Sequence, residues 1–508
     1  MINNTDRYYP NNDYLKEYKD KNIGIQAFGA RLYADQTLYE YLIEFLLIFI
    51  SKKSQSEDDI MKFHNSNESN FDYYTELKIG LKRFIFFENS KLETKYDIDK
   101  ELYKRLKKEL EKKIEKEDED DFFQDENIAG IFQEFFYGFA AILKNRSWYA
   151  QSLLPLCPEI IFPESIAGKA QRKIIKINDT NLTLSEIEKN FKLNEHDFLA
   201  RGGEVYYLHI LLGLKNNDDL KRKLEYLLKG MISNKKISKL ARVIQSISDE
   251  MIELKKEDAW HKKSMKFIPY DYEKRGEESC KEIINLLSNG IDNFKKIELF
   301  AVGMMLQIFR MIQERSIMND SKKAFWVVSL CDDDVVKKFS IESYNEFESQ
   351  IDGKLREYLD FSKEINFDKG GNAAKLKDGE KHSINLVRKL GKQIGLIVPP
   401  KGKNMRFTFS EEILKFLVLA IVKPREKMEF NTFLDKLYEK FGIVISPEHI
   451  GIVYKGIADK VEMQGYFEKN KLALQNLLKN IGFLRNLSDA TSIVENPYDS
   501  IIKEGDCK

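Results

Sequence analysis

Cysteine is scarce in this sequence, and its four copies, Cys157, Cys280, Cys331 and Cys507, lie far apart. Because no Cys-x-x-Cys pair is present, the spacing indicates neither a zinc ribbon nor a disulfide framework. A chain without such a framework is typical of a reducing compartment, so we expect a cytoplasmic protein. The first residues also lack the basic start and apolar run of a signal peptide, which argues against secretion.

The signatures of common catalytic sites are missing as well. The sequence has no GxxxxGK[ST] loop, no GxGxxG fingerprint, no HExxH helix and no GxSxG elbow. Its six histidines are scattered without the spacing of metal ligands. We therefore assign no catalytic residue, no metal ligand and no cofactor, and we expect a binding or assembly protein rather than an enzyme.

The sequence also has no apolar run long enough to span a membrane and no excess of one charge. The longest apolar segment, Leu38–Ile50, has roughly 13 residues, fewer than the ~20 that cross a bilayer, and contains Glu40 and Glu44. It predicts a buried core helix, as does Ala301–Ile312, and we expect no membrane partner. The 82 basic and 82 acidic residues balance, so only a local patch could attract nucleic acid.

What is present is mostly helical periodicity, with Leu102, Leu106 and Leu110 as one example of a stripe on a charged helix. The sequence predicts a mainly α, multi-domain protein with a small β-hairpin near residues 174–184. Its 508 residues exceed one typical core. We divide them into an N-terminal helical domain (1–155), a central helical domain (156–365), a flexible linker (366–404), a winged-helix-like domain (405–498) and a tail (499–508).

The C-terminal part carries the most informative pattern. Ser410 can cap one amphipathic helix, and Gly442 can end a second in the left-handed conformation. A later helix over 469–481 is followed by two strand-like segments, 483–487 and 491–494. Helices followed by a short hairpin are the element order of a winged helix, a fold that serves either DNA binding or protein assembly.

Two groups of side chains are candidates for nucleic-acid binding. One would contact phosphates in a way that depends on salt and not on base sequence. The other would place a helix in the major groove and the base of a wing on phosphate, as DNA-binding winged helices do. The first lies in the basic stretch 215–266 of the central domain, and the second lies on the helix before the hairpin and at the hairpin base. These candidates are Lys221, Arg222, Lys223, Lys235, Lys236, Lys239, Arg242, Lys471, Gln475, Lys479 and Arg485. A solvated helix face is the alternative interpretation of the same charges.

A glycine turn, Arg201-Gly202-Gly203, is a possible anion-binding site because two glycines permit a tight turn with exposed amides. His209 follows it closely, and an Arg–His pair could in principle cut RNA. A structural turn entering a buried helix is the competing and favoured interpretation.

Two acidic motifs are candidate metal sites. Asp332-Asp333-Asp334 offers oxygen ligands, but adjacent side chains point in different directions, and carboxylates favour the start of a helix. Asp72 with Glu76 and Lys78 echoes the carboxylate and Glu-x-Lys set of metal-dependent nucleases. That short pattern supports only an alternative, a divergent metal-dependent nuclease.

The segments Phe198–His209 and Gly482–Tyr498 resemble parts of uncharacterised accessory subunits encoded in prokaryotic defence islands. The resemblance implies an anti-phage complex in which this chain is the non-catalytic member and a partner ATPase or nuclease does the chemistry. We therefore expect a scaffold or nucleic-acid-sensing subunit with protein partners and, in the sensing case, DNA. A pure protein–protein assembly factor is the remaining alternative.

Overall fold

A computed structural model describes residues 8–9, 22–29, 32, 36–54, 60–68, 71–76, 78, 81, 104–112, 128–139, 153–163, 165–167, 193–195, 202–251, 260–265, 268–317, 324–364, 371–454, 461–486 and 492–502. In this part of the chain the protein is mainly helical, as predicted, and the strands form small separate sheets. No helix of the described ranges is long and apolar enough to cross a membrane.

The helices are α2 (Ile23–Phe28), α3 (Leu38–Ile50), α6 (Ile128–Tyr137), α9 (Gly202–Gly213), α10 (Asp218–Met231), α11 (Lys235–Met251), α13 (Gly276–Leu287), α14 (Asn293–Ser316), α15 (Asp334–Glu364), α16 (Asn372–Lys381), α17 (Ile384–Gln393), α18 (Glu411–Ile421), α19 (Phe430–Phe441), α20 (Pro447–Val453) and α21 (Val461–Asn480). Residues 104–112 are also helical, and Pro158–Ile160 and Tyr270–Arg275 form 3-10 turns.

The strands are β1 (Tyr8–Tyr9), β2 (Asp72–Glu76), β3 (Ser165–Ala167), β4 (Leu193–Glu195), β5 (Trp260–Ser264), β6 (Ile268–Pro269), β7 (Trp326–Val327), β8 (Ile397–Val398), β9 (Arg406–Phe407), β10 (Lys427–Glu429), β11 (Ile443–Val444), β12 (Leu484–Asn486) and β13 (Ser492–Glu495). Most pair two by two and antiparallel, for example β2 with β5 and β8 with β9. The pair β7–β11 is parallel, and β10, β13 and β12 form a three-stranded sheet in that order.

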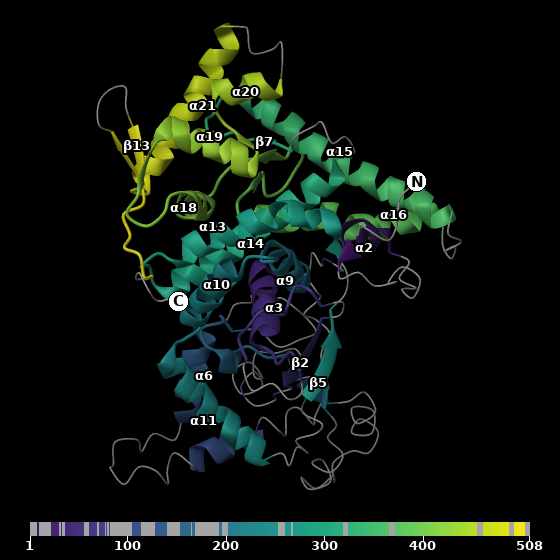
Figure 1. The fold of residues 1–508 in the computed structure, drawn as a ribbon, viewed down its shortest axis with the longest axis vertical. Coiled ribbons are helices and arrows are strands. Elements are labelled where there is room, and N and C mark those ends of the chain that lie inside the picture. Colours follow the sequence, from purple (N-terminus) through teal and green to yellow (C-terminus); the bar gives the residue numbers. More distant parts are fainter. Residues whose placement is uncertain are drawn as a thin grey trace.

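Helix α3 lies inside the helical body, as its apolar sequence predicts (Figure 1). It begins with a capping box, in which Thr37 and Glu40 satisfy each other's backbone amides. Its face packs against α9 and α14, where the Phe45 ring meets Tyr206 and Phe300 edge to face, with ring centroids 5.5 and 5.6 Å apart. The predicted helix over Ala301–Ile312 is the buried middle of α14.

Helix α18 belongs to the same hydrophobic core as the body, because it packs on α13 and α14. Gly303 of α14 leaves the space that the Phe416 ring fills, since a Cβ there would lie 2.1 Å from the ring. Ser410 caps α18 by accepting from the Ile413 amide, as predicted. The C-terminal part therefore begins inside the body.

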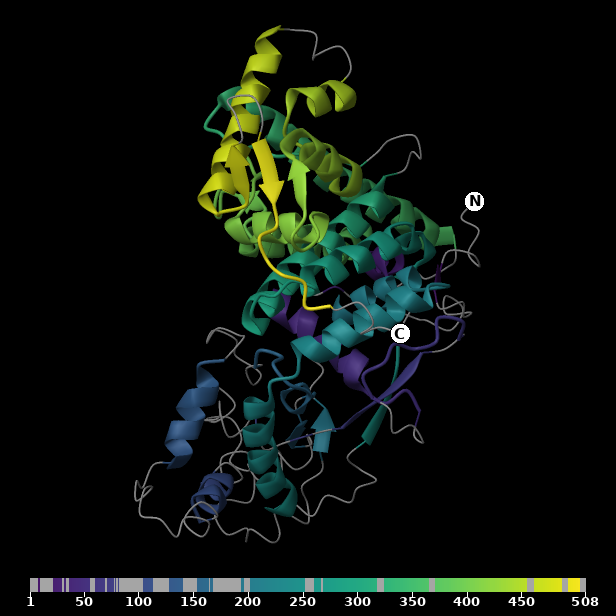
Figure 2. The same cartoon turned by 60° about the vertical axis from the view of Figure 1, so that its left-hand side comes forward.

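The rest of the C-terminal part, α19 to β13, rises from the body at the top of Figure 1, and Figure 2 shows its small sheet from another side. Gly442 ends α19 in the left-handed conformation, with φ 64°, as predicted. The predicted hairpin is present as β12 and β13, and β10 adds a third strand that the sequence did not reveal. Helix α21 starts at Val461, earlier than predicted, and packs against α15.

Residues 371–404 differ from the expected flexible linker. They form α16, α17 and β8, and Leu386, Val387 and Leu390 are buried in the main core. Within α16, Lys375 and Gly379 are the buried residues, so the lysine and glycine content of this stretch does not mark a linker. The apolar spacing of α17 accounts for the burial of that helix. The predicted hairpin near 174–184 lies outside the described residues.

Candidate functional site

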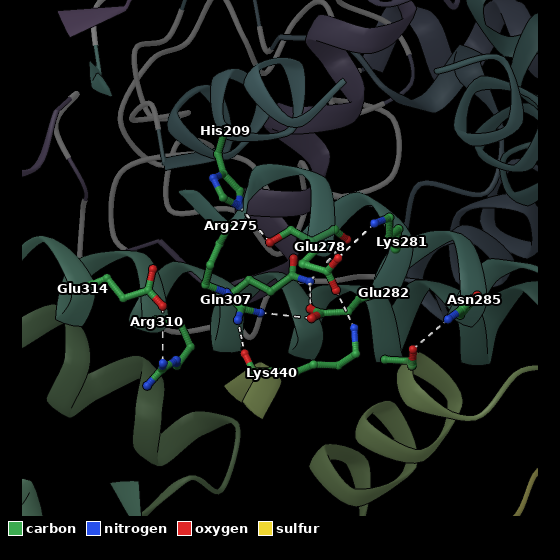
Figure 3. Close-up of polar contacts among 12 residues, drawn as sticks. His209, Arg275, Glu278, Lys281, Glu282, Asn285, Gln307, Arg310, Glu314 and Lys440 are labelled. Atoms are coloured by element: carbon green, nitrogen blue, oxygen red, sulfur yellow. Dashed lines mark hydrogen bonds and ion pairs between the residues drawn. The ribbon is translucent and has the colours of Figure 1, made fainter. Parts of the chain in front are cut away.

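A buried polar network joins the body to the C-terminal part, and Figure 3 shows it between α13, α14 and α19. The Tyr206 hydroxyl donates to Gln307 Oε1 over 2.5 Å, and Gln307 Nε2 donates to Glu282 Oε2 over 2.7 Å. Arg275 Nη2 donates to the other oxygen, Oε1, of Glu282 over 3.0 Å. The Glu282 carboxylate is thus buried with one cationic and one neutral donor.

The same network reaches the C-terminal end of α19. Arg275 donates to the Lys440 carbonyl, and the Lys440 ammonium pairs with Glu278 of α13. Arg310 lies beside Gly442, where an added Cβ would be 2.9 Å from the guanidinium. The half-buried Arg275 and the buried Arg310 therefore face the carbonyl end of α19, which is the negative end of the helix dipole.

Burial and pairing oppose each other in the pKa values of this network. Burial raises the pKa of Glu282 above its ordinary value, although Arg275 and Gln307 favour the charged form. Burial also acts to raise the pKa of Glu278, but hydrogen bonds from Lys440 and Lys281 lower it overall. Tyr206, Gln307 and Glu282 are buried, and each donor of the network faces an acceptor oxygen. We infer that the network fixes α19 on the body.

The sequence did not point to this network, although one signal was present. Gln307 and Arg310 interrupt the apolar run of α14, and polar groups inside a buried helix must find partners in neighbouring elements. The partners themselves, Arg275, Glu282 and Lys440, come from distant parts of the chain, and only the packing of α13, α14 and α19 brings them together.

The predicted basic residues of the central part lie on α10 and α11, but several of them already have hydrogen-bond or ion-pair partners within the protein. Lys221 donates to the His64 carbonyl, Arg222 pairs with Asp219, and Arg242 Nε lies 2.7 Å from Glu159 Oε1. Lys223 is half-buried. The first turns of α11 differ, because Lys235, Lys236 and Lys239 are exposed there and have no ion-pair partner among the described residues.

The predicted nucleic-acid residues of the helix before the hairpin are also partly neutralised. Lys471 of α21 lies 3.3 Å from Glu448, and Arg485 of β12 lies 2.5 Å from Glu495. Gln475 is half-buried and Lys479 is exposed. Of this group, Lys479 is the cation that remains without a carboxylate partner in the described structure.

The glycine turn begins α9, and its amide is already occupied. Gly203 N donates to Glu44 Oε2 of α3 over 2.7 Å, so an internal carboxylate occupies the predicted anion position. Added Cβ atoms at Gly202 and Gly203 would lie 2.0 Å from the Tyr41 ring and 2.3 Å from the Tyr41 carbonyl. These contacts agree with the structural turn, and Arg201 lies outside the described residues.

His209 is fully buried and satisfied on both ring nitrogens. Its Nδ1 lies 2.9 Å from the Tyr272 carbonyl and its Nε2 lies 2.9 Å from Ser279 Oγ. Burial lowers its pKa to about 3, so the ring is neutral at physiological pH. It has the environment of a packing residue and not that of a base that meets RNA.

A second arrangement, which the sequence did not suggest, resembles a hydrolase triad. Ser446 Oγ lies 2.9 Å from His449 Nδ1, and His449 Nε2 lies 3.2 Å from Asp435 Oδ1. Ser446 is fully buried at the N-cap position of α20, with His449 three residues later. The hydroxyl is therefore enclosed in protein and is not exposed to a substrate, although its side chain makes no capping hydrogen bond.

The carboxylates of each acidic motif do not come together to form an ion-binding site. Asp332 and Asp334 both pair with Lys337, whereas Asp333 accepts from the Val335 amide at the start of α15, as the helix-start interpretation predicts. In the other motif, Glu76 pairs with Lys78 at 3.0 Å and Asp72 with Lys262 at 2.7 Å. No cluster of three metal-binding side chains exists in the described part of the chain.

Comparison with known proteins assigns the chain to no family. No family model, no curated protein and no solved structure matches the chain.

Proposed function

We propose that this chain is a non-catalytic scaffold or nucleic-acid-sensing subunit of a prokaryotic, cytoplasmic multi-protein complex of anti-phage defence. In this proposal a partner ATPase or nuclease carries the catalysis. We further propose that residues 405–498 form a winged helix. The support for the fold is the order of elements: α18, β10, α19, β11, the pair α20–α21, and then the hairpin β12–β13. Strand β13 lies between β10 and β12, whereas β11 pairs with β7 of the body.

The observation that carries the scaffold role is the apolar surface of α20 and α21. Leu472 is 55% exposed and Ile452 is 53% exposed, while the neighbouring cation Lys471 is paired with Glu448. A DNA-reading helix needs free basic and amide groups, whereas exposed leucine and isoleucine gain by burial against another protein. The face therefore favours a protein partner over the major groove.

Partner capture tests this role. We expect the tagged full-length chain to co-purify with the ATPase or nuclease encoded next to its gene, and Leu472→Asp to lose that capture. Val243→Asp, an equivalent change at an exposed apolar residue of α11, is the matched control and should retain it. Equal capture by both variants would remove α21 from the interface, and capture of no neighbouring gene product would count against the complex itself.

Nucleic-acid sensing remains the second candidate because of the unpaired lysines at the start of α11. Electrophoretic shift at several salt concentrations tests it, since phosphate contacts weaken steeply with salt. Lack of binding to duplex and single strands even at low salt would remove it. The nuclease alternative has no such support, because Asp72 and Glu76 are each paired with lysine.

A further inference from the structure

We propose that the corner formed by α6, α11 and the start of α14 is a surface for single-stranded nucleic acid. It combines exposed rings on which bases can stack with exposed lysines that can reach phosphates. The proposal rests on the nucleic-acid-sensing half of the proposed function and places it on the body, away from the winged-helix-like part. α6 and α11 lie near each other at the opposite end of the molecule from α21 (Figure 1).

The aromatic half of this surface is continuous. Phe135 of α6 is 47% exposed, and its ring contacts Phe139 with centroids 5.2 Å apart. Phe139 in turn stacks on Phe294 of α14, with centroids 5.5 Å apart and ring planes at 25°, and Phe294 is 41% exposed. Ile131, one helical turn before Phe135, is 54% exposed and extends the apolar area.

Hydrogen bonds join this aromatic row to the start of α11. The Leu154 amide donates to the Phe139 carbonyl over 2.9 Å, and two residues later the Leu156 carbonyl accepts from the Asn234 amide over 3.1 Å. Asn234 then accepts from the Ile237 amide in the first turn of α11. The segment 154–156 therefore spans the short distance between the rings and the lysines.

A second link runs from α14 to the turn before α11. Asn293 Nδ2, next to Phe294, donates to the Gly230 carbonyl over 3.2 Å, and Ser233 Oγ also donates to that carbonyl. The exposed Tyr226 lies one helical turn before Gly230 on α10. The start of α14 and the turn before α11 thus meet at the end of α10.

The lysines at this corner are not explained by helix stability. Lys235, Lys236 and Lys239 lie in the first turns of α11, where the positive end of the helix dipole disfavours cations. On α13, α14 and α18, by comparison, Lys281, Lys295 and Lys415 are held by carboxylates three or four residues away. At the start of α11, Glu159 is already shared by Arg242 and Ser238.

This combination fits a single strand better than a duplex. Unpaired bases expose their faces, and base–aromatic stacking contributes ~1–3 kcal/mol per base with little dependence on sequence. A paired base offers no free face to Phe135 or Phe294. The lysines, at one edge of the aromatic row, would follow the backbone while the rings hold the bases.

Fluorescence anisotropy of the full-length chain with a labelled oligo-dT and with a duplex tests the proposal. We expect the wild type to prefer the single strand, and Phe135→Leu and Phe294→Leu each to weaken binding about tenfold, because leucine keeps the apolar volume but removes the ring. The triple variant Lys235→Gln, Lys236→Gln, Lys239→Gln should lower the salt slope by about 2, since each phosphate contact on a single strand contributes ~0.7.

Matched controls are Tyr498→Leu, an exposed ring near the C-terminal sheet, and Lys401→Gln with Lys403→Gln, two exposed lysines of another loop. Both should bind as the wild type does. Absence of single-strand binding at low salt, preference for the duplex, or unchanged affinity of the leucine variants would each overturn the proposal. Partner capture by the same leucine variants is read separately, so this surface and the scaffold role can fail independently.

Discussion

At the scale of single residues, the charged groups that matter most in the described structure are the buried ones. Glu282 is buried where α13 meets α19, and its cationic partner Arg275 has 11% of its side chain exposed. Removal of one partner leaves the other charge buried without compensation, which costs much more than the loss of an exposed pair. Arg222 and Asp219 form such an exposed pair.

We therefore expect Arg275→Met to lower the free energy of unfolding by ~3–5 kcal/mol, because the Glu282 carboxylate loses its cation. Arg222→Met should cost less than ~1 kcal/mol, since its pair is screened by solvent. Urea unfolding followed by circular dichroism measures both. Similar losses in the two variants would mean that the Arg275–Glu282 pair is not buried as described.

Buried histidines predict how stability depends on pH. Burial lowers the pKa values of His64 and His209 from 6.5 to about 3, so the folded protein resists their protonation while the unfolded chain does not. Their contribution is complete above pH 6.5 and is lost as the pH falls toward 3. Between pH 6 and pH 5, each of these histidines should lower the free energy of unfolding by about 1 kcal/mol, because one proton taken up by the unfolded chain changes it by ~1.4 kcal/mol per pH unit.

The free energy of unfolding, measured in urea at pH 6 and 5, checks this expectation. His209→Gln removes one titrating group, so its stability should fall less steeply over that interval than that of the wild type. The comparison uses the difference between the two pH values, and an overall loss of stability in the variant does not affect it. Identical slopes would show that the ring of His209 takes up a proton in the folded state.

At the scale of elements, the close contact of α3 and α9 depends on a glycine. Gly203→Ala would place a Cβ 2.3 Å from the Tyr41 carbonyl, a backbone atom that cannot move without its helix. Gly230, near the end of α10, has nothing within 4 Å of its Cβ position. The same substitution therefore has opposite consequences on two helices.

We expect Gly203→Ala to lower the free energy of unfolding by several kcal/mol or to prevent folding, through overpacking of α3 against α9. Gly230→Ala should be neutral or stabilise by up to ~1 kcal/mol, because alanine is the better helix former. Thermal unfolding of the two variants side by side measures the difference. Equal melting temperatures would contradict the described contact.

The sequence predicted elements better than their associations. The apolar run of α3, the Ser410 cap and the Gly442 stop depend on local chemistry, and all three are confirmed. The helices of 371–404 were missed because glycine and lysine on α16 outweighed the apolar spacing of α17 in our interpretation. The third strand, β10, is only three residues long, and its pairing with β13 depends on a contact that no local pattern records.

The candidate sites show the same limit. The sequence shows which residue types stand at a helix start or in a basic stretch. It does not show whether a carboxylate lies beside them in the folded protein. Glu44 occupies the amide of Gly203, and Glu448 and Glu495 neutralise Lys471 and Arg485. These partners are remote in the sequence or on other elements, so only the packed structure separates the paired cations from the free ones.

At the scale of the whole molecule, the C-terminal part is not a detachable unit. α18 fills the space above Gly303, β11 pairs with β7, and Lys440 reaches Glu278. Arg275 and Arg310 both face the end of α19. The body and the C-terminal part thus share apolar packing, a backbone ladder and a polar network.

We expect a chain that ends at residue 404 to be unstable, because it exposes the apolar faces of α13 and α14 that α18 covers. It should aggregate or bind a hydrophobic dye, and the full-length chain should unfold in a single transition by calorimetry and circular dichroism. A well-folded 1–404 fragment, or two separate transitions in the full-length chain, would contradict the shared core.

The place of Phe416 above Gly303 also has a consequence in time. A ribosome makes α14 long before α18, so the helices of the nascent body emerge with their receiving groove uncovered. Until α18 is synthesised, the apolar faces of α13 and α14 are exposed and prone to aggregation. Slower translation of the stretch between α14 and α18 would lengthen that exposure. We expect the yield of intact protein in the cell to depend on chaperones that bind the unfinished chain during its synthesis.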